Sequence, residues 1–102
     1  MKEKIKKDGA TVLVEAPEDK QFVLANGKKI GHYVEIADMI EELHHDVLSH
    51  HVNDLKHDFA MWISNVFSEE ELAQELAKET DPKRIRLLIY KNLVDKYLRG
   101  DM

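Results

Sequence analysis

The stretch from Tyr33 to Arg99 contains no glycine and a single proline, Pro82. Glycine and proline are the residues that most often interrupt regular structure. A stretch of this length with only one of them therefore favours helices. Apolar residues recur within it at helical spacing. One set is Tyr33, Ile36, Ala37, Ile40 and Leu43, and a second is Leu48, Val52, Leu55, Phe59, Trp62 and Val66. Both sets are predicted to face the core of a mostly helical domain.

Two local signals predict where later helices begin. Ser68, with Glu71 three residues further on, has the pattern of a capping box, in which each side chain bonds a free backbone N–H of the first turn. Asp81 followed by Pro82 combines an N-cap with proline at the first helical position, and Gly100 is a typical stop. The apolar positions of this last helix are Ile85, Leu88, Ile89, Leu93 and Tyr97.

The first third of the chain predicts short strands. Thr11–Glu15 and Gln21–Ala25 are rich in β-branched and aromatic residues, and Pro17–Lys20 separates them. The Asn26-Gly27 pair follows the second run, and such a pair between apolar runs is a strong signal for a β-hairpin. We therefore expect a short antiparallel meander or hairpin.

Length and composition fit one folded domain. The chain has 102 residues, of which 43% are hydrophobic and 34% charged, within the range of globular proteins. We predict an α+β, mostly α domain over residues 11–102, with a β-hairpin region in residues 11–31 and four to five helices in residues 32–100. Residues 1–10 are expected to form a basic flexible tail. No apolar run approaches the roughly 20 residues that span a bilayer, so we expect a cytoplasmic protein without a membrane partner.

Charge is segregated along the chain. Residues 1–31 carry seven Lys against five acids, residues 32–79 carry two Lys against twelve acids, and residues 80–102 carry six Lys or Arg against three acids. The acidic middle can be neutralised by the basic ends within the fold or across an oligomer. A sharper interpretation is a nucleic-acid-binding face on the last helix. It would use Lys83, Arg84, Arg86, Lys91 and Arg99, but these lack interleaved aromatic residues for base stacking.

Five of the six histidines lie between His44 and Asp58, and the chain has no cysteine. If residues 46–66 are helical, His50, Asp54 and His57 share the face opposite the apolar set. Imidazole and carboxylate ligands suit a divalent metal such as zinc, nickel or iron. The alternative is a solvated histidine-rich face.

A second possible metal motif precedes that segment. Glu42 and His45 form a Glu-x-x-His pair, which di-iron carboxylate bundles contribute from each of two helices. Such a site could be completed across a dimer. With eleven Glu and six His in the chain, pairs of this kind also arise by chance.

His51 and Asp58 flank the second apolar set close to Phe59 and Trp62. A partly buried imidazole or carboxylate needs a hydrogen-bonding partner. We predict a structural polar pair, with a His–Asp hydrogen bond across a helix break near Asn53. The alternative, a general base oriented by a carboxylate, lacks an evident nucleophile or substrate pocket.

Several of these residues also form a pattern. Phe22-Val-Leu-Ala-Asn-Gly27, His51-Val52 and above all Asp58-Phe-Ala-Met-Trp-Ile63 resemble a family of small uncharacterised prokaryotic domains, over about residues 22–77. The resemblance implies an α-rich domain with His51, Asp58 and Trp62 as signature positions, and it implies no activity. The expected core signature is Phe22, Gly27, Phe59 and Trp62. The histidines at 44, 45, 50 and 57 depart from the family pattern.

The chain shows no phosphate-binding glycine loop and no cofactor fingerprint. We therefore expect a non-enzymatic module for protein–protein interaction or oligomerisation, without a cofactor. A His/carboxylate metal-binding protein is the alternative, and nucleic-acid binding is less favoured. Apolar residues left over from the core sets would build the surface that binds a partner or a second copy. They are Val34, Met39, Met61 and Leu87.

Overall fold

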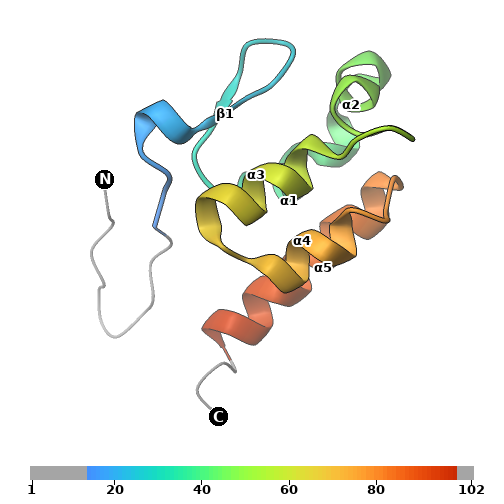
Figure 1. Ribbon diagram of the computed structural model, residues 1–102. Coiled ribbons are helices and arrows are strands. Elements are labelled where there is room, and N and C mark those ends of the chain that lie inside the picture. Colours follow the sequence, from blue (N-terminus) through green and yellow to red (C-terminus); the bar gives the residue numbers. More distant parts are fainter. Residues whose placement is uncertain (1–13, 99–102) are drawn as a thin grey trace.

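The computed structural model describes residues 14–98 and shows an α+β fold that is mostly helical, as the sequence predicts (Figure 1). The predicted tail, residues 1–10, lies outside the described residues. Two short 3₁₀ helices accompany the main elements. The order is η1 (Glu18–Lys20), β1 (Phe22–Val23), β2 (Lys29–Ile30), α1 (Val34–Met39), η2 (Ile40–Glu42), α2 (His45–His51), α3 (Asp58–Phe67), α4 (Glu70–Leu76) and α5 (Pro82–Tyr97).

The two strands form an antiparallel hairpin in which Phe22 pairs with Ile30. Its turn is closed by the Gly27 N–H, which donates to the Leu24 carbonyl at 2.8 Å. Gly27 has a φ of 92°, a conformation that only glycine adopts without strain, which explains the hairpin signal of Asn26-Gly27.

The predicted strand at Thr11–Glu15 is not a strand in its described part. Residues 11–13 lie outside the described residues, and Val14 and Glu15 have no regular structure. One backbone hydrogen bond of 2.7 Å, from Ala16 N–H to the Gly31 carbonyl, joins this segment to the hairpin. Within residues 14–98 the sheet therefore has two strands, and a meander is not formed.

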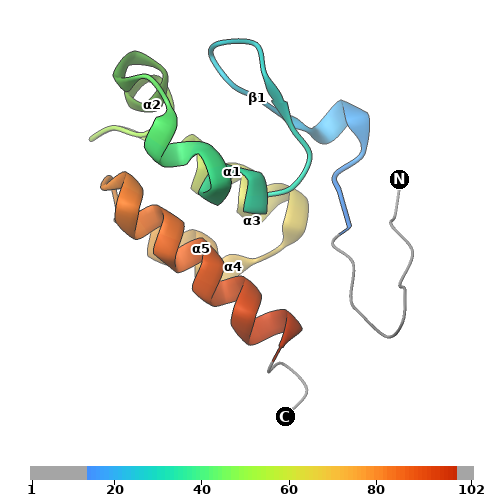
Figure 2. The same cartoon turned by 180° about the vertical axis from the view of Figure 1, so that it is seen from behind.

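The core lies between the helices and the inner face of the hairpin. α1 packs against α5, and α3 packs against α4, which in turn contacts α5. Figure 2 shows α5 on the near side with α4 behind it. The first apolar set is almost fully buried, as predicted, with Tyr33, Ile36 and Ile40 each 1% exposed. None of the helices within residues 14–98 combines the length and hydropathy that crossing a membrane requires.

The second apolar set does not form one helix. α2 ends at His51. The side chain of Asn53 then bonds backbone groups on both sides of it, so the helix does not continue. Its Nδ2 donates to the Ser49 carbonyl and its Oδ1 accepts the Leu55 N–H, both at 2.9 Å. Asparagine satisfies backbone groups in this way in turns, at the expense of a helix. The prediction that Leu55 faces the core is therefore wrong, because its side chain lies in the turn and is 95% exposed.

The predicted capping box is also absent. Ser68 adopts a positive φ of 57° and ends α3, and the N-cap of α4 is Glu69, without a side-chain capping bond. At α5 the predicted start is confirmed. Asp81 Oδ1 accepts the Lys83 N–H at 3.0 Å, and Pro82 is the first helical residue.

Candidate functional site

The loop between α2 and α3, residues 52–57, is held at both ends. Val52 and His57 form an isolated antiparallel bridge. Inside that bridge the Asn53 N–H donates to the Lys56 carbonyl at 3.0 Å. Together with the two Asn53 side-chain bonds, these contacts fix the loop as a tight turn.

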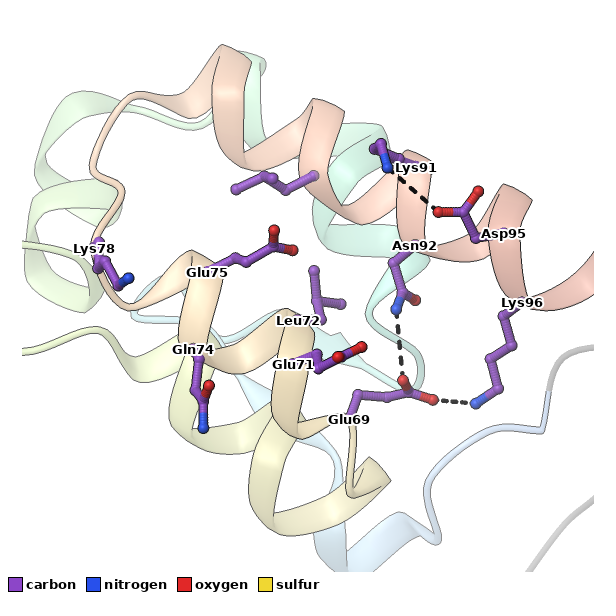
Figure 3. Close-up of a pocket in the computed structure, with 11 residues that line it drawn as sticks. Glu69, Glu71, Leu72, Gln74, Glu75, Lys78, Lys91, Asn92, Asp95 and Lys96 are labelled. Carbon is purple, nitrogen blue, oxygen red and sulfur yellow. Dashed lines mark hydrogen bonds and ion pairs between the residues drawn. The ribbon is translucent and has the colours of Figure 1, made fainter. Parts of the chain in front are cut away.

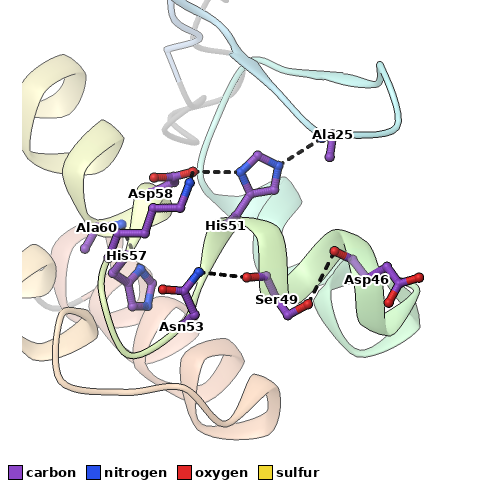
Figure 4. Close-up of polar contacts among 9 residues, drawn as sticks. Ala25, Asp46, Ser49, His51, Asn53, His57, Asp58 and Ala60 are labelled. Carbon is purple, nitrogen blue, oxygen red and sulfur yellow. Dashed lines mark hydrogen bonds and ion pairs between the residues drawn. The ribbon is translucent and has the colours of Figure 1, made fainter.

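His51 links this loop to the hairpin. Its Nδ1 lies 2.9 Å from Asp58 Oδ2, and its Nε2 accepts the Ala25 N–H at 2.9 Å (Figure 4). Because Nε2 accepts from a backbone donor, the ring proton of the neutral imidazole is on Nδ1 and is donated to Asp58. The structure thus contains the hydrogen bond expected from the sequence, across the break near Asn53. Since both ring nitrogens are engaged, the pair acts here as a structural connection.

Asp58 is also paired with a lysine. Lys56 Nζ lies 3.1 Å from the same oxygen, Asp58 Oδ2. Partial burial opposes the charge of the carboxylate, but the hydrogen bonds from His51 and Lys56 outweigh it and lower the pKa of Asp58. Asp58 therefore stays ionised and anchors both the buried ring and the loop.

A group of aromatic rings covers this connection. The Phe22 ring lies 4.9 Å from His51, 5.1 Å from Phe59 and 5.6 Å from Trp62, measured between centroids. Trp62 Nε1 donates to the Lys20 carbonyl at 2.8 Å, so its polar edge is satisfied. The expected core signature is thus brought together, apart from Gly27, which shapes the hairpin turn.

His57 caps the start of α3. Its Nδ1 accepts the Ala60 N–H at 3.2 Å, which leaves Nε2 as the protonated nitrogen of the neutral ring. Nε2 is buried and makes no hydrogen bond of normal geometry. Burial lowers the pKa of His57, and the nearby Glu79 backbone only partly opposes this. His57 is therefore an uncharged capping residue of α3.

A groove of about 510 Å³ runs between the 52–57 loop, α3 and α4. Two exposed apolar side chains line it, Leu55 of the loop, 95% exposed, and Met61 of α3, 60% exposed. We call it the Leu55–Met61 groove. It is lined by Asn53, Asp54, Leu55, Lys56, His57, Ala60, Met61, Ser64, Glu70, Ala73, Gln74 and Ala77.

Sequence reasoning only partly anticipated this surface. Met61 and Leu87 are exposed as expected, at 60% and 66%, but Leu87 lies on α5 and does not line the groove. Val34 and Met39 are partly buried, and Met39 packs against the core. Leu55 was assigned to the core from its spacing. The turn-forming Asn53 just before it was the available signal for its exposure.

A second groove, of about 680 Å³, lies on the other side of α4, against α5. We call it the α4–α5 groove. Figure 3 shows two ion pairs among its charged side chains: Glu69 is paired with Lys96, and Lys91 Nζ lies 3.4 Å from Asp95 Oδ2. Asn92 connects Glu69 to the core, because its Oδ1 accepts a 3.1 Å hydrogen bond from the Tyr33 hydroxyl. These polar groups satisfy one another.

His32 was missed by the sequence reasoning, although it is one of two buried histidines among the described residues and only 3% exposed. It stacks on Tyr33 at 4.3 Å, and its Nδ1 accepts the Val34 N–H at 3.0 Å. Burial, with a smaller effect of Lys96, lowers the pKa of His32 to about 4. The carboxylates that oppose this lowering are Glu35, Glu15 and Glu69. The position of His32 just before α1 was the only local signal that its side chain is buried.

The predicted metal ligands are not brought together. His50, Asp54 and His57 would share a face only in a continuous helix, and the turn after α2 separates them. His50 and Asp54 are exposed, whereas His57 is directed into the cap of α3. Glu42 and His45 are both exposed, on η2 and α2. Within residues 14–98, no three His, Cys, Asp or Glu side chains are grouped so that they could hold a metal ion.

The predicted basic face of α5 is largely neutralised within the chain. Arg84 Nε lies 2.9 Å from Glu79, Arg86 Nη1 lies 2.7 Å from Glu41, and Lys91 pairs with Asp95. Lys83 forms no ion pair within the part of the chain that the structure describes, and Arg99 lies outside that part. A phosphate backbone would have to compete with these internal carboxylates.

No family model matches this chain, and neither the curated proteins nor the solved structures contain a significant match to it. The resemblance based on the Asp-Phe-Ala-x-Trp-Ile pattern therefore stays a prediction.

Proposed function

We propose that this chain is a non-enzymatic protein–protein interaction module that holds a short segment of a partner in the Leu55–Met61 groove. The observation that carries the proposal is Leu55, which is 95% exposed although the loop beneath it is fixed by hydrogen bonds. Burying a leucine side chain contributes about 1.5 to 3 kcal/mol. A loop that is already ordered loses little entropy when it binds.

The size of the groove supports a short segment as the occupant. Twelve residues line it, whereas a standard interface between folded proteins uses roughly 20 to 30 residues on each side. Ala60, Ala73 and Ala77 are among the lining residues. Small side chains let the backbone of a bound helix approach closely, so an amphipathic helix fits this groove.

The charge of the groove indicates the chemistry of the segment. Asp54 and Glu70 line it, and the charge of Lys56 is neutralised by Asp58. Residues 32–79 as a whole carry two Lys against twelve acids. We therefore infer that the partner segment is basic, with leucine-like residues on one face and Lys or Arg beside them.

The test is an NMR titration of the ¹⁵N-labelled chain with a designed helical peptide that has Leu at i, i+3, i+4 and i+7 and Lys on its flanks. We expect saturable shifts confined to residues 53–61 and α4. Leu55→Asp should weaken binding at least about tenfold, because it removes about 1.5 kcal/mol or more of apolar burial. It should change the free energy of unfolding by no more than about 0.5 kcal/mol.

The matched control is Leu87→Asp on α5, a leucine that is also exposed, at 66%, but lies outside the groove, and this variant should bind the peptide normally. A peptide with Glu in place of Lys should bind more weakly. Absence of saturable shifts, or equal binding by the Leu55→Asp variant, would show that the groove is not the binding surface.

A further inference from the structure

The wall of the Leu55–Met61 groove contains a histidine whose hydrogen bonds fit only the uncharged ring. His57 lines the groove and forms the bridge with Val52 that closes the loop. Its Nδ1 accepts the Ala60 N–H at 3.2 Å at the start of α3 (Figure 4). An imidazolium carries a proton on each nitrogen and accepts no hydrogen bond. A protonated His57 therefore cannot cap α3 from its present position.

The place of the ring opposes a positive charge in two further ways. His57 precedes the first turn of a ten-residue helix, and the N-terminus of a helix carries a partial positive charge. A proton on Nδ1 would also face the Ala60 N–H, one donor against another. The second ring nitrogen, Nε2, is buried and makes no hydrogen bond of normal geometry, so water does not solvate the ring on that side. The charged ring is accommodated only after it leaves this position.

The nearby carboxylates do not compensate for these effects. Asp58 on α3 and Glu79, between α4 and α5, are the two whose negative charge acts on the His57 ring. Both are already ion-paired, Asp58 with Lys56 of the loop and Glu79 with Arg84 of α5. Burial is the largest effect on the ring and lowers the pKa of His57.

We propose that His57 makes the groove sensitive to pH: on gaining a proton the ring leaves the cap of α3, the Val52–His57 bridge opens and the 52–57 loop is released. For its consequence this inference rests on the proposed function. The groove holds a partner segment at neutral pH and releases it on acidification, because a released loop has to be ordered again when the segment binds.

The direction of the pH effect follows from the two states of the loop. In the released loop His57 has its ordinary pKa of about 6.5, and in the capped loop its pKa is lower. The released loop therefore binds the proton more readily. The capped loop is fully favoured above about pH 6.5, and release increases as the pH falls below that value.

Amide hydrogen exchange of the full chain at pH 7.5 and 5.5, without any peptide, tests the release. We expect the protection factors of the Asn53 and Ala60 amides to fall by up to about tenfold at pH 5.5, since that pH is one unit below the ordinary pKa of His57. In His57→Asn the new side chain caps α3 without titrating, so the protection of both amides should not depend on pH. Equal protection of the unmodified chain at the two pH values, or the same fall in His57→Asn, would overturn the inference.

The Ile89 amide separates this local release from unfolding of the whole domain. Ile89 is fully buried in α5, so its exchange reports opening of the core, to which protonation of His32 contributes. The protection of Ile89 should change equally in the unmodified chain and in His57→Asn, and by less than that of Asn53. A fall at Ile89 as large as that at Asn53 would mean that the loop has no release of its own and would contradict the inference.

The peptide titration, repeated at pH 5.5 with an N-terminally acetylated peptide, tests the consequence for binding. We expect the Kd of the unmodified chain to be about three- to tenfold higher at pH 5.5 than at pH 7.5. His57→Asn should bind equally at both. Equal affinity of the unmodified chain at the two pH values would overturn the control of the groove by His57. A peptide that binds at neither pH would contradict the proposed function, whereas the exchange measurement decides the release of the loop independently.

Discussion

The two grooves beside α4 differ in how their lining is satisfied. In the α4–α5 groove, Glu69 pairs with Lys96, and Lys91 pairs with Asp95. In the Leu55–Met61 groove, the Asn53 side chain is bonded to backbone groups of its own loop, and the apolar side chains of Leu55 and Met61 are exposed to solvent. A bound segment would have to break existing ion pairs in the first groove, but would only displace water in the second.

The two regions are also held by different interactions. The 52–57 loop, which lines the Leu55–Met61 groove, is anchored by His51, which is 5% exposed and bonded at both ring nitrogens. The charged rim of the α4–α5 groove carries two ion pairs at the surface, and such pairs contribute little in water. The Leu55–Met61 groove therefore combines a loop that is fixed by hydrogen bonds with exposed apolar side chains. For this reason we propose that it is the binding surface.

The largest predicted effect follows from removing the anchor. His51→Ala should lower the free energy of unfolding by about 3 kcal/mol, because the Ala25 N–H loses its acceptor and a cavity forms beside Phe22. Urea denaturation measures this. His51→Gln, which keeps one donor and one acceptor, should lose less. If His51→Ala were as stable as the unmodified chain, the loop would not depend on this connection.

A pH effect of similar size is predicted next to the α4–α5 groove. The pKa of His32 is about 4 in the fold against an ordinary 6.5, so the unfolded chain binds the proton more readily. Stability is complete above pH 6.5 and falls as the pH drops from 6.5 to 4, by up to about 3 kcal/mol. Denaturation at several pH values should show this slope.

His32→Asn is the control for that measurement, since Asn can still accept the Val34 N–H but does not titrate. This variant should have a flatter profile between pH 6.5 and 4. An unchanged slope would place the titrating group elsewhere, with His57, whose pKa is also lowered by burial, as the first alternative.

The smallest predicted effect is in the α4–α5 groove. Lys96→Met removes the ion pair with Glu69 but keeps the aliphatic stem, and both side chains are partly exposed. The loss of stability should be no more than about 1 kcal/mol, and less at high salt. A loss as large as that of His51→Ala would remove the contrast between the two regions.

The sequence by itself determined the elements with strong local causes. Helical spacing identified the buried set around Tyr33 and Ile36, Asn26-Gly27 identified the hairpin, and Asp81-Pro82 identified the start of α5. Each depends on residues within a few positions of one another, whose backbone preferences act in any context.

Tertiary structure decided the rest, and above all the groove. The spacing of Leu55 fitted a continuous helix, but the Asn53 bonds and the Val52–His57 bridge compete with it and place the side chain in solvent. The pairing of Arg86 with Glu41, 45 residues apart, likewise neutralises a face that looks basic in the sequence. Such outcomes depend on which distant elements lie nearby, because hydrogen bonds and ion pairs form with whatever partner the fold brings within reach.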